Sequence, residues 1–457
     1  MKHSTRCIRA RTLALGLVTA LLAHGAAAAT DSDADVARIV DHDLAGLVAY
    51  YKALHAAPEL SRQEAQTSAQ LAAELKAAGY EVTEHLGKYL SPTYKGYGLV
   101  GVMKNGAGPT VLIRADMDAL PVAEKTGLPY ASTKHTKNEA GLDVPVMHAC
   151  GHDVHVTSLI GVARVLAKLK DRWSGTLVLL GQPAEETIDG AEALIRDGLY
   201  DKVPKPDVAL ALHVMPSTPA GTIGITSGFA LATSTQMDVL VRGVGGHGSQ
   251  PQDAKDPVVL AANIIMQLQT IVAREISPFD QAVLTVGTIH GGTKRNIIPD
   301  EVKLELNLRA YKEEVRQHMI EAVARISRAA ALGAGMPEER LQIVHVLENE
   351  FAPALKNDPA LTQRLKPVFE RALGPGNVRE VPPIMASEDF GRLGLDGKIP
   401  VMMFFVGSIS PEALAESART GVPVPINHSP LYAPVPEPAI RTGIVAMSAA
   451  ALDLLHR

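Results

Sequence analysis

Short apolar runs that each lead into a polar side chain are the feature of this sequence that most constrains its fold. Residues 110–115 run into Asp116, residues 176–180 precede Glu185 and Glu186, and residues 208–212 end at His213. The runs are apolar enough to be buried on both faces of a sheet, and helical periodicity lies between them. The pattern predicts an α/β fold, a mostly parallel sheet with helices on both faces.

The polar residues that follow these runs are expected to lie together. In open parallel sheets, binding sites form beyond the carboxyl ends of the strands. Asp116, Glu185, Glu186 and His213 each follow a strand at that end. A random distribution would place polar residues at both ends, so this placement predicts a functional site.

A hexapeptide near the middle of the chain, His148-Ala-Cys150-Gly-His152-Asp153, reads as half of a metal site. Cys150 and His152 can point the same way from a tight loop, and Gly151 allows the chain to bend between them. The alternative is a buried cysteine beside histidines that only satisfy hydrogen bonds in the core. The odds of a metal rise if the protein is exported, because Cys150 is then the only thiol of the mature chain and coordination would protect it.

Residues 1–29 are expected to be a secretory signal peptide. Four basic residues precede an apolar stretch and a run of alanines, and the stretch is too short and interrupted for a membrane anchor. The mature protein is therefore expected in the periplasm or outside the cell, without a membrane association. Cleavage leaves 40 Lys and Arg against 49 Asp and Glu, a net charge of −9, which argues against nucleic-acid binding.

The sequence pattern changes at about residue 233 and returns at about 349. The intervening segment reads β-α-β-β-α-β, which predicts a ferredoxin-like unit with an antiparallel sheet. We therefore expect a catalytic domain in two parts, residues 30–232 and 349–457, with residues 233–348 inserted between them. The Gly-rich turn at residues 243–249 is a poor phosphate loop, because no Lys-Ser/Thr follows it.

The candidate donors match the needs of two-metal hydrolysis. That chemistry requires oxygen, nitrogen or sulfur ligands for two ions about 3.5–4 Å apart and a carboxylate that accepts a proton from water. Adjacent Glu185 and Glu186 point in different directions on an extended backbone, so one can bind metal while the other faces the water. Tandem glutamates are usually a solvated surface pair, but these follow a core strand through Gln182-Pro-Ala.

With these residues in place, the chain strongly resembles the aminoacylase, hippurate hydrolase and indole-acetyl-amino-acid amidohydrolase family of co-catalytic metallopeptidases. The resemblance extends in order over nearly the whole mature chain. The matching stretches are His55-Ala-Ala-Pro58-Glu59-Leu60-Ser61, Asp116-Met-Asp118-Ala-Leu-Pro121, the central hexapeptide, Gln182-Pro-Ala-Glu185-Glu186, Gly245-Gly-His247, Asn296-Ile-Ile-Pro299-Asp300, Ser387-Glu-Asp-Phe390 and Asn427-His428-Ser429-Pro430.

The resemblance implies a zinc-peptidase-like catalytic domain and a role for each matching residue. It implies two divalent metal ions per subunit, with zinc favoured over manganese, cobalt or nickel, and Cys150 as the bridging ligand. Glu185 would be the general base, while Asp116 and Asp118 would orient a ligating histidine; a direct bond from Asp116 to metal stays open. The implied metal ligands are Cys150, His152, Glu186, His213 and His428.

The inserted unit of such proteins is a lid and a dimerisation surface. His247 would then stabilise the oxyanion, in its own site or a neighbouring subunit's, and the expected assembly is a dimer or a dimer of dimers. Asn296 and Arg309 would receive the free carboxylate of the substrate. A surface arginine at a strand end is the alternative for Arg309.

The expected reaction is hydrolysis of small N-acyl amino acids or peptides. Alternatives are a dipeptidase or carboxypeptidase on the same site, or a periplasmic metal- or peptide-binding protein without catalysis, against which Glu185 argues. The chain departs from the family pattern at Thr187-Ile-Asp189 and Gln252, and residues 88–97 and 132–143 form longer stretches than a minimal member needs. These departures make the acyl preference the least transferable property.

Overall fold

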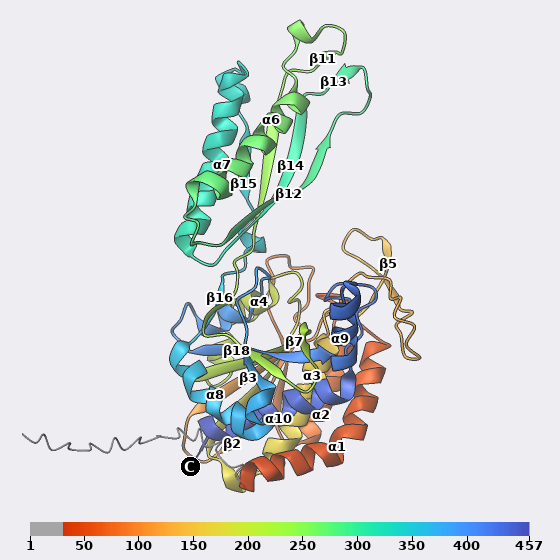
Figure 1. Ribbon diagram of the computed structural model, residues 1–457, viewed down its shortest axis with the longest axis vertical. Helices are drawn as coiled ribbons and strands as arrows, with labels where there is room; N and C mark the ends of the chain where they lie inside the picture. Colours follow the sequence, from red (N-terminus) through yellow and green to blue (C-terminus); the bar gives the residue numbers. More distant parts are fainter. Residues whose placement is uncertain (1–30, 457) are drawn as a thin grey trace, which may run out of the picture.

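Two sheets organise the chain, a large one in the lower part of Figure 1 and a small one above it. This computed structural model describes residues 31–456, so the expected signal peptide lies outside the described residues. The large sheet has the strand order β1-β2-β6-β3-β7-β18-β8-β17. Its strands are β1 (Glu81–Leu86), β2 (Gly98–Asn105), β3 (Thr110–Asp116), β6 (Gly175–Gln182), β7 (Val208–Pro219), β8 (Ile223–Ile225), β17 (Val378–Glu380) and β18 (Val401–Ile409).

The centre of the large sheet is parallel and buried on both faces. Strand β3 pairs in parallel with β6 and β7, and β7 with β18. Along β3, Val111 and Ile113 join one hydrophobic core, and Leu112 joins the other. A strand with two buried faces needs apolar side chains at successive positions, which explains the continuous run at residues 110–115.

Helices cover both faces of this sheet, so the predicted α/β architecture is confirmed. One face carries the longer helices, which pack on each other as well as on the strands. These are α1 (Asp31–His55), α2 (Ala65–Ala77), α3 (His152–Lys168), α8 (Pro359–Leu373) and α10 (Pro436–Leu454). The opposite face is covered by α4 (Gly190–Arg196), α5 (Leu199–Lys202) and the short helix η7 (Phe390–Gly394).

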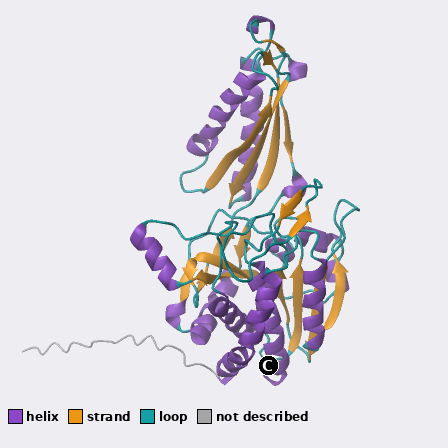
Figure 2. Ribbon diagram, turned by 90° about the vertical axis from the view of Figure 1, so that its right-hand side faces the viewer, coloured by secondary structure: helices purple, strands orange, loops and turns teal. Residues whose placement is uncertain are grey.

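The small sheet is antiparallel, with the order β12-β14-β10-β15 of a ferredoxin-like unit. Two helices lie side by side on one of its faces (Figure 2) and form a separate core with it. The elements are β10 (Thr235–Arg242), α6 (Pro257–Thr270), β12 (Ala282–Gly291), β14 (Glu301–Ala310), α7 (Glu313–Gly333) and β15 (Ile343–Val346). A two-stranded piece, β11 (Gly246–His247) with β13 (Ile297–Ile298), forms the end of this unit farthest from the large sheet (Figure 1).

Two backbone segments join the sheets, where Ser234 pairs with Ala352. Close to them, β9 (Gly228–Leu231) pairs with β16 (Leu355–Asn357). The larger unit also carries the hairpin of β4 (His135–Lys137) with β5 (Asp143–Pro145), and helix α9 (Pro411–Thr420).

Helix α6 buries only part of its apolar surface. Leu260, Ile264 and Leu268 face the small core, whereas Val259 and Met266 are 67% and 71% exposed. Among the described residues, Pro257–Glu275 is long and apolar enough to cross a membrane by length and composition, and 33% of that stretch is buried. Core packing of one face of α6 accounts for part of this hydrophobicity.

Candidate metal centre

The predicted donors converge beyond the carboxyl ends of the central strands. Glu185 and Glu186 follow β6, and His213 lies within β7. Cys150 and His152 lie at the start of α3, where Gly151 has φ 88°. A Cβ on Gly151 would come within 2.5 Å of Val214 Cγ2, so only glycine allows this close loop.

Two groups of donors share the Cys150 thiol. Cys150 lies with His152 and His213 in one group and with Glu186 and His428 in the other, and within each group the ligand atoms are at most 4.8 Å apart. Cys150 Sγ is 3.5 Å from His213 Nε2, and Glu186 Oε1 is 3.5 Å from His428 Nε2. Sulfur, nitrogen and carboxylate donors at these spacings suit two divalent ions with a common thiolate.

In each of two histidines, His152 and His213, one ring nitrogen is hydrogen-bonded to the backbone and the other faces the candidate metal donors. His152 Nδ1 donates to the Asp118 carbonyl oxygen at 2.9 Å, and His213 Nδ1 donates to the Val214 carbonyl oxygen at 2.8 Å. In these tautomers the Nε2 atoms carry lone pairs toward the other donors. Burial alone would lower the pKa of His152, but Asp116 and Asp118 raise it to about 10, so a metal there would replace a proton on Nε2. His152 Nε2 and Glu186 Oε1 are buried without a hydrogen-bond partner. A bound cation would satisfy both atoms, so the donor set fits the metals that the sequence implies.

The electrostatics of the centre favour cations. Burial, and then the negative charges of Glu186 and Glu185, raise the pKa of Cys150 well above its usual range. Burial lowers the pKa of His213 to about 4, which keeps its imidazole neutral. Divalent ions would turn the thiol into a thiolate and offset the excess of carboxylates.

Glu185 differs from Glu186 in its neighbours. Its carboxylate lies in one donor group with His152 and Glu186 and in another with Glu388 and Asp389, and His152 Nε2 is 3.8 Å from Glu185 Oε2. The side chain is buried, and burial followed by the charge of Glu388 raises its pKa. Glu185 is thus beside the donor groups but not in either group that contains Cys150.

Asp118 holds the backbone of the glutamate pair. Its carboxylate accepts hydrogen bonds from the N–H of Glu185 at 3.2 Å, from the N–H of Glu186 at 2.9 Å and from the Ser61 hydroxyl at 2.6 Å. The pair lies between Ala184 and Ile188, which have positive φ values of 53° and 60°. Such strained residues persist only where surrounding contacts determine the backbone.

Asp116 is held by two side chains that sequence reasoning missed. Its carboxylate accepts hydrogen bonds from His155 Nδ1 and from Arg114 Nη1, each at 2.5 Å. His155 Nε2 accepts a hydrogen bond from the N–H of Val214, so neither nitrogen is free for metal. The spacing of His155 one turn after His152, and a charge inside the buried run 110–115, were signals for both residues.

Arg114 ties the centre to a second buried acidic segment. Its Nη2 donates to Glu388 at 2.6 Å and lies 3.4 Å from Asp389. Gln182 bridges Arg114 and Asp389. Glu388 and Asp389 belong to a motif that the sequence analysis matched without assigning a role.

His55, from the first matching stretch, is hydrogen-bonded to Asp153, the residue that follows the candidate ligand His152. Its Nδ1 donates to Asp153 at 2.6 Å and its Nε2 to Glu124 at 3.1 Å. Burial alone would lower the pKa of His55, but these bonds raise it to about 10. An imidazolium there links α1 to the residue that follows His152.

The predicted residues of the small unit are not at this centre. His247 and Asn296 are exposed. His247 belongs to β11 and Asn296 directly precedes β13, the two strands at the end of the unit farthest from the large sheet (Figure 1). Arg309 lies near the junction, where its Nη1 donates to the Met385 carbonyl oxygen at 2.7 Å and its Nε to Asn307 at 2.8 Å. The structure therefore brings together the metal and base candidates but not His247, Asn296 and Arg309.

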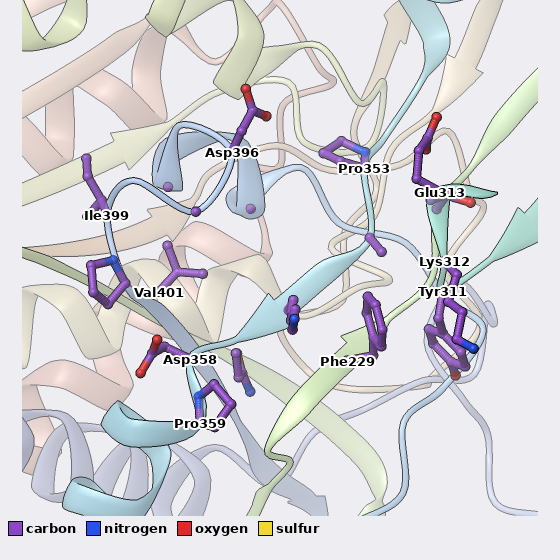
Figure 3. Close-up of a pocket in the computed structure, with 18 of the residues that line it drawn as sticks. Phe229, Tyr311, Lys312, Glu313, Pro353, Asp358, Pro359, Asp396, Ile399 and Val401 are labelled. Carbon is purple, nitrogen blue, oxygen red and sulfur yellow. The ribbon is translucent and has the colours of Figure 1, made fainter. Parts of the chain in front are cut away.

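Two cavities lie where the units meet. One of about 1060 Å³ reaches Glu186 and is bounded by both units. The other, of about 700 Å³, contains a stacked pair, Phe229 and Tyr311 (Figure 3), and none of the predicted site residues lines it. The first cavity thus connects the Glu186 side of the candidate metal centre with the space between the units.

A family model, peptidase family M20/M25/M40, matches residues 112–424. The match begins in β3 and ends beyond α9. It includes Cys150, both glutamates and His213, and it stops four residues before His428.

Three curated relatives resemble the chain over most of their length. A hippurate hydrolase of Campylobacter jejuni is 37% identical over 74% of this chain and 82% of its own. An N-acetyl-L-cysteine deacetylase of Bacillus subtilis is 36% identical over 75% and 76%. Thermostable carboxypeptidase 2 of Saccharolobus solfataricus is 34% identical over 88% and 94%.

A solved structure has a similar fold over nearly the whole chain. A Bacillus subtilis protein described as a dinuclear metal-binding peptidase of the M20 family aligns with a TM-score of 0.70 and 26% identity, covering 91% of this chain and 99% of its own. The resemblance inferred from the motifs is thereby confirmed.

Proposed function

The chain belongs to peptidase family M20/M25/M40 and is a metal-dependent amidohydrolase, and from this premise we propose that it hydrolyses the amide bond of N-acyl amino acids. One observation carries the proposal: two groups of metal donors share Cys150, and the buried Glu185 carboxylate lies beside them. The names of two relatives, a hippurate hydrolase and an N-acetyl-L-cysteine deacetylase, support the substrate class.

The proposed ligands are Cys150, His152, Glu186, His213 and His428, with zinc the favoured ion because thiolate and imidazole donors suit it. Divalent ions bound there would polarise the scissile carbonyl and make water more acidic. The protein's own contribution is to orient the donors through Asp118, Val214 and the Asp116–His155 pair.

Glu185 is the proposed general base and acid. Its carboxylate would accept a proton from the attacking water and deliver it to the nitrogen of the leaving amino acid. Burial and the charge of Glu388 raise its pKa, and divalent ions bound beside it would oppose this shift and leave the carboxylate able to accept the proton. The Asp118 bonds to both glutamate N–H groups keep this carboxylate on the side of the donor groups.

We also propose an exported homodimer, or a dimer of such dimers. Strand β12 is an edge strand with Ile289 59% exposed, and the neighbouring α6 exposes Val259 and Met266. A second copy could cover this apolar surface and bring its His247 to the site of the first. In such a dimer, His247 of one subunit would stabilise the oxyanion in the site of the other.

A carboxypeptidase is the second candidate, favoured by the 34% identity to the Saccharolobus enzyme over 94% of its length. The two activities differ in whether a free α-amine on the substrate is tolerated.

A hydrolysis screen decides between them. The mature protein, loaded in turn with zinc, manganese, cobalt or nickel, is assayed on N-acetyl, N-benzoyl and indole-acetyl amino acids and on dipeptides. Preferential hydrolysis of the N-acyl compounds is expected. Faster cleavage of dipeptides would favour the second candidate, and no hydrolysis with any metal would exclude both.

A further inference from the structure

Three stretches that the sequence analysis singled out meet at one side chain, Arg62. The guanidinium contacts Glu139 in the stretch 132–143. It donates to one oxygen of Asp189 from Nη2 at 2.6 Å and from Nε at 3.2 Å. Its central carbon lies 4.6 Å from the ring centroid of Tyr94 in the stretch 88–97. We call Arg62, Tyr94, Glu139 and Asp189 the Arg62 clamp.

The clamp is attached to the turn that carries Glu185 and Glu186. Glu64 Oε1 accepts hydrogen bonds from the N–H groups of Arg62 and Ala184, each at 2.8 Å. Asp189 also accepts from the Thr187 hydroxyl at 2.8 Å. The chain on both sides of Glu185 and Glu186 is therefore bound to the segment that carries Arg62, which itself has φ 66°.

All four clamp residues line the cavity of about 1060 Å³ that reaches Glu186. The Arg62 side chain is 14% exposed, and its Nε and both Nη atoms are already bonded to carboxylates. It is therefore poorly placed to bind a substrate carboxylate. Its position makes it part of the wall, and its bonds determine how close the three stretches come to each other.

We propose that Arg62 is a specificity-determining residue, which sets the size of the substrate group that extends from the metal centre into this cavity. The inference rests on the proposed function, because it concerns the same site. Arginine suits the role because its planar fork binds two carboxylates and stacks on an aromatic ring, which lysine cannot do together.

Selectivity is measured as ratios of kcat/KM in two series. One series varies the acyl group, N-acetyl against N-benzoyl glycine, and the other varies the amino acid, N-acetyl glycine against N-acetyl leucine. Arg62→Ala should shift at least one ratio toward the bulkier substrate by about tenfold or more, a change typical of altered pocket size. Arg62→Lys should be intermediate. Glu139→Gln should shift the same ratio in the same direction, and because Glu139 is 52% exposed, this variant avoids a folding defect.

The control is Arg364→Ala, which breaks an exposed ion pair between α8 and Asp453 of α10. This variant should leave both selectivity ratios unchanged. A fall by one common factor for every substrate in Arg62→Ala and Glu139→Gln would mean a purely structural role and would overturn the proposal.

Hydrogen exchange gives a readout that does not depend on activity. Peptides covering residues 88–97, 132–143 and 184–190 should exchange faster in Arg62→Ala than in the wild type or in Arg364→Ala. Unchanged exchange would show that Arg62 does not hold the wall. A wild type that hydrolyses no substrate would refute the proposed function instead; the size limit is then tested by calorimetric binding of the same N-acyl compounds, and equal affinity ratios in wild type and Arg62→Ala would overturn it.

Discussion

The Cys150 thiol is shared by two groups of candidate metal donors, one with His152 and His213 and the other with Glu186 and His428, so its loss would affect both groups. Replacing Cys150 with Ala should therefore remove at least one of two bound ions, because the described residues offer no other thiol nearby. Elemental analysis of the purified protein measures the number of metal ions per chain. Two ions per chain in the variant would reduce Cys150 to a core residue.

Arg114 is a fully buried cation among Asp116, Glu388 and Asp389. Arg114→Met would leave these carboxylates without their counter-charge, and breaking a buried pair from one side typically costs about 3–5 kcal/mol. Denaturant unfolding measures the loss. Arg364→Ala, which breaks an exposed pair, should change the free energy of unfolding by about 1 kcal/mol or less. An equally small change for Arg114→Met would show that the network does not stabilise the fold.

At the scale of elements, His55 connects the end of α1 to Asp153 at the start of α3. Its pKa is raised from 6.5 to about 10 in the folded protein. A raised folded pKa contributes stability that is complete below pH 6.5 and is lost as the pH rises toward 10. The free energy of unfolding should therefore fall between pH 7 and pH 10 more steeply for the wild type than for His55→Gln. Parallel profiles would mean that His55 is not protonated in the fold.

The sequence predicted the elements and donors that follow periodicity and strand ends. Cys150 and His152 were identified from the hexapeptide that leads into α3, and His213 and the glutamate pair because they follow the apolar runs that form strands of a parallel sheet. The resemblance alone made Glu186, and not Glu185, the predicted ligand. His428 was identified only through the resemblance, since it lies in a loop without regular structure. The Arg62 clamp was not predicted, because Arg62 is 77 residues from Glu139 and 127 from Asp189, and such contacts depend on side-chain packing between loops.

At the scale of the whole molecule, His247 belongs to β11, at the end of the small unit farthest from the large sheet that carries the candidate metal centre (Figure 1). If it acts in a neighbouring subunit, His247→Ala should lower turnover by about 10²–10³-fold, as for a lost oxyanion donor, with both metals retained. Mixing this variant with Glu185→Gln should restore activity, because a mixed dimer has one site with both residues intact.

Activity after mixing, together with a dimer in sedimentation measurements, would support a dimer in which His247 of one subunit acts in the site of the other. Mixtures no more active than the separate variants would contradict a role across subunits. Wild-type turnover in His247→Ala would assign this residue a structural role.

The most direct test of the central claim compares Glu185→Gln with Glu186→Gln, since the claim assigns proton transfer to one and metal binding to the other. Metal content and turnover are measured on the same preparations. Glu185→Gln should retain both ions and lose about 10²–10⁴-fold in turnover, whereas Glu186→Gln should lose metal. Loss of metal from Glu185→Gln as severe as from Glu186→Gln would contradict the assignment.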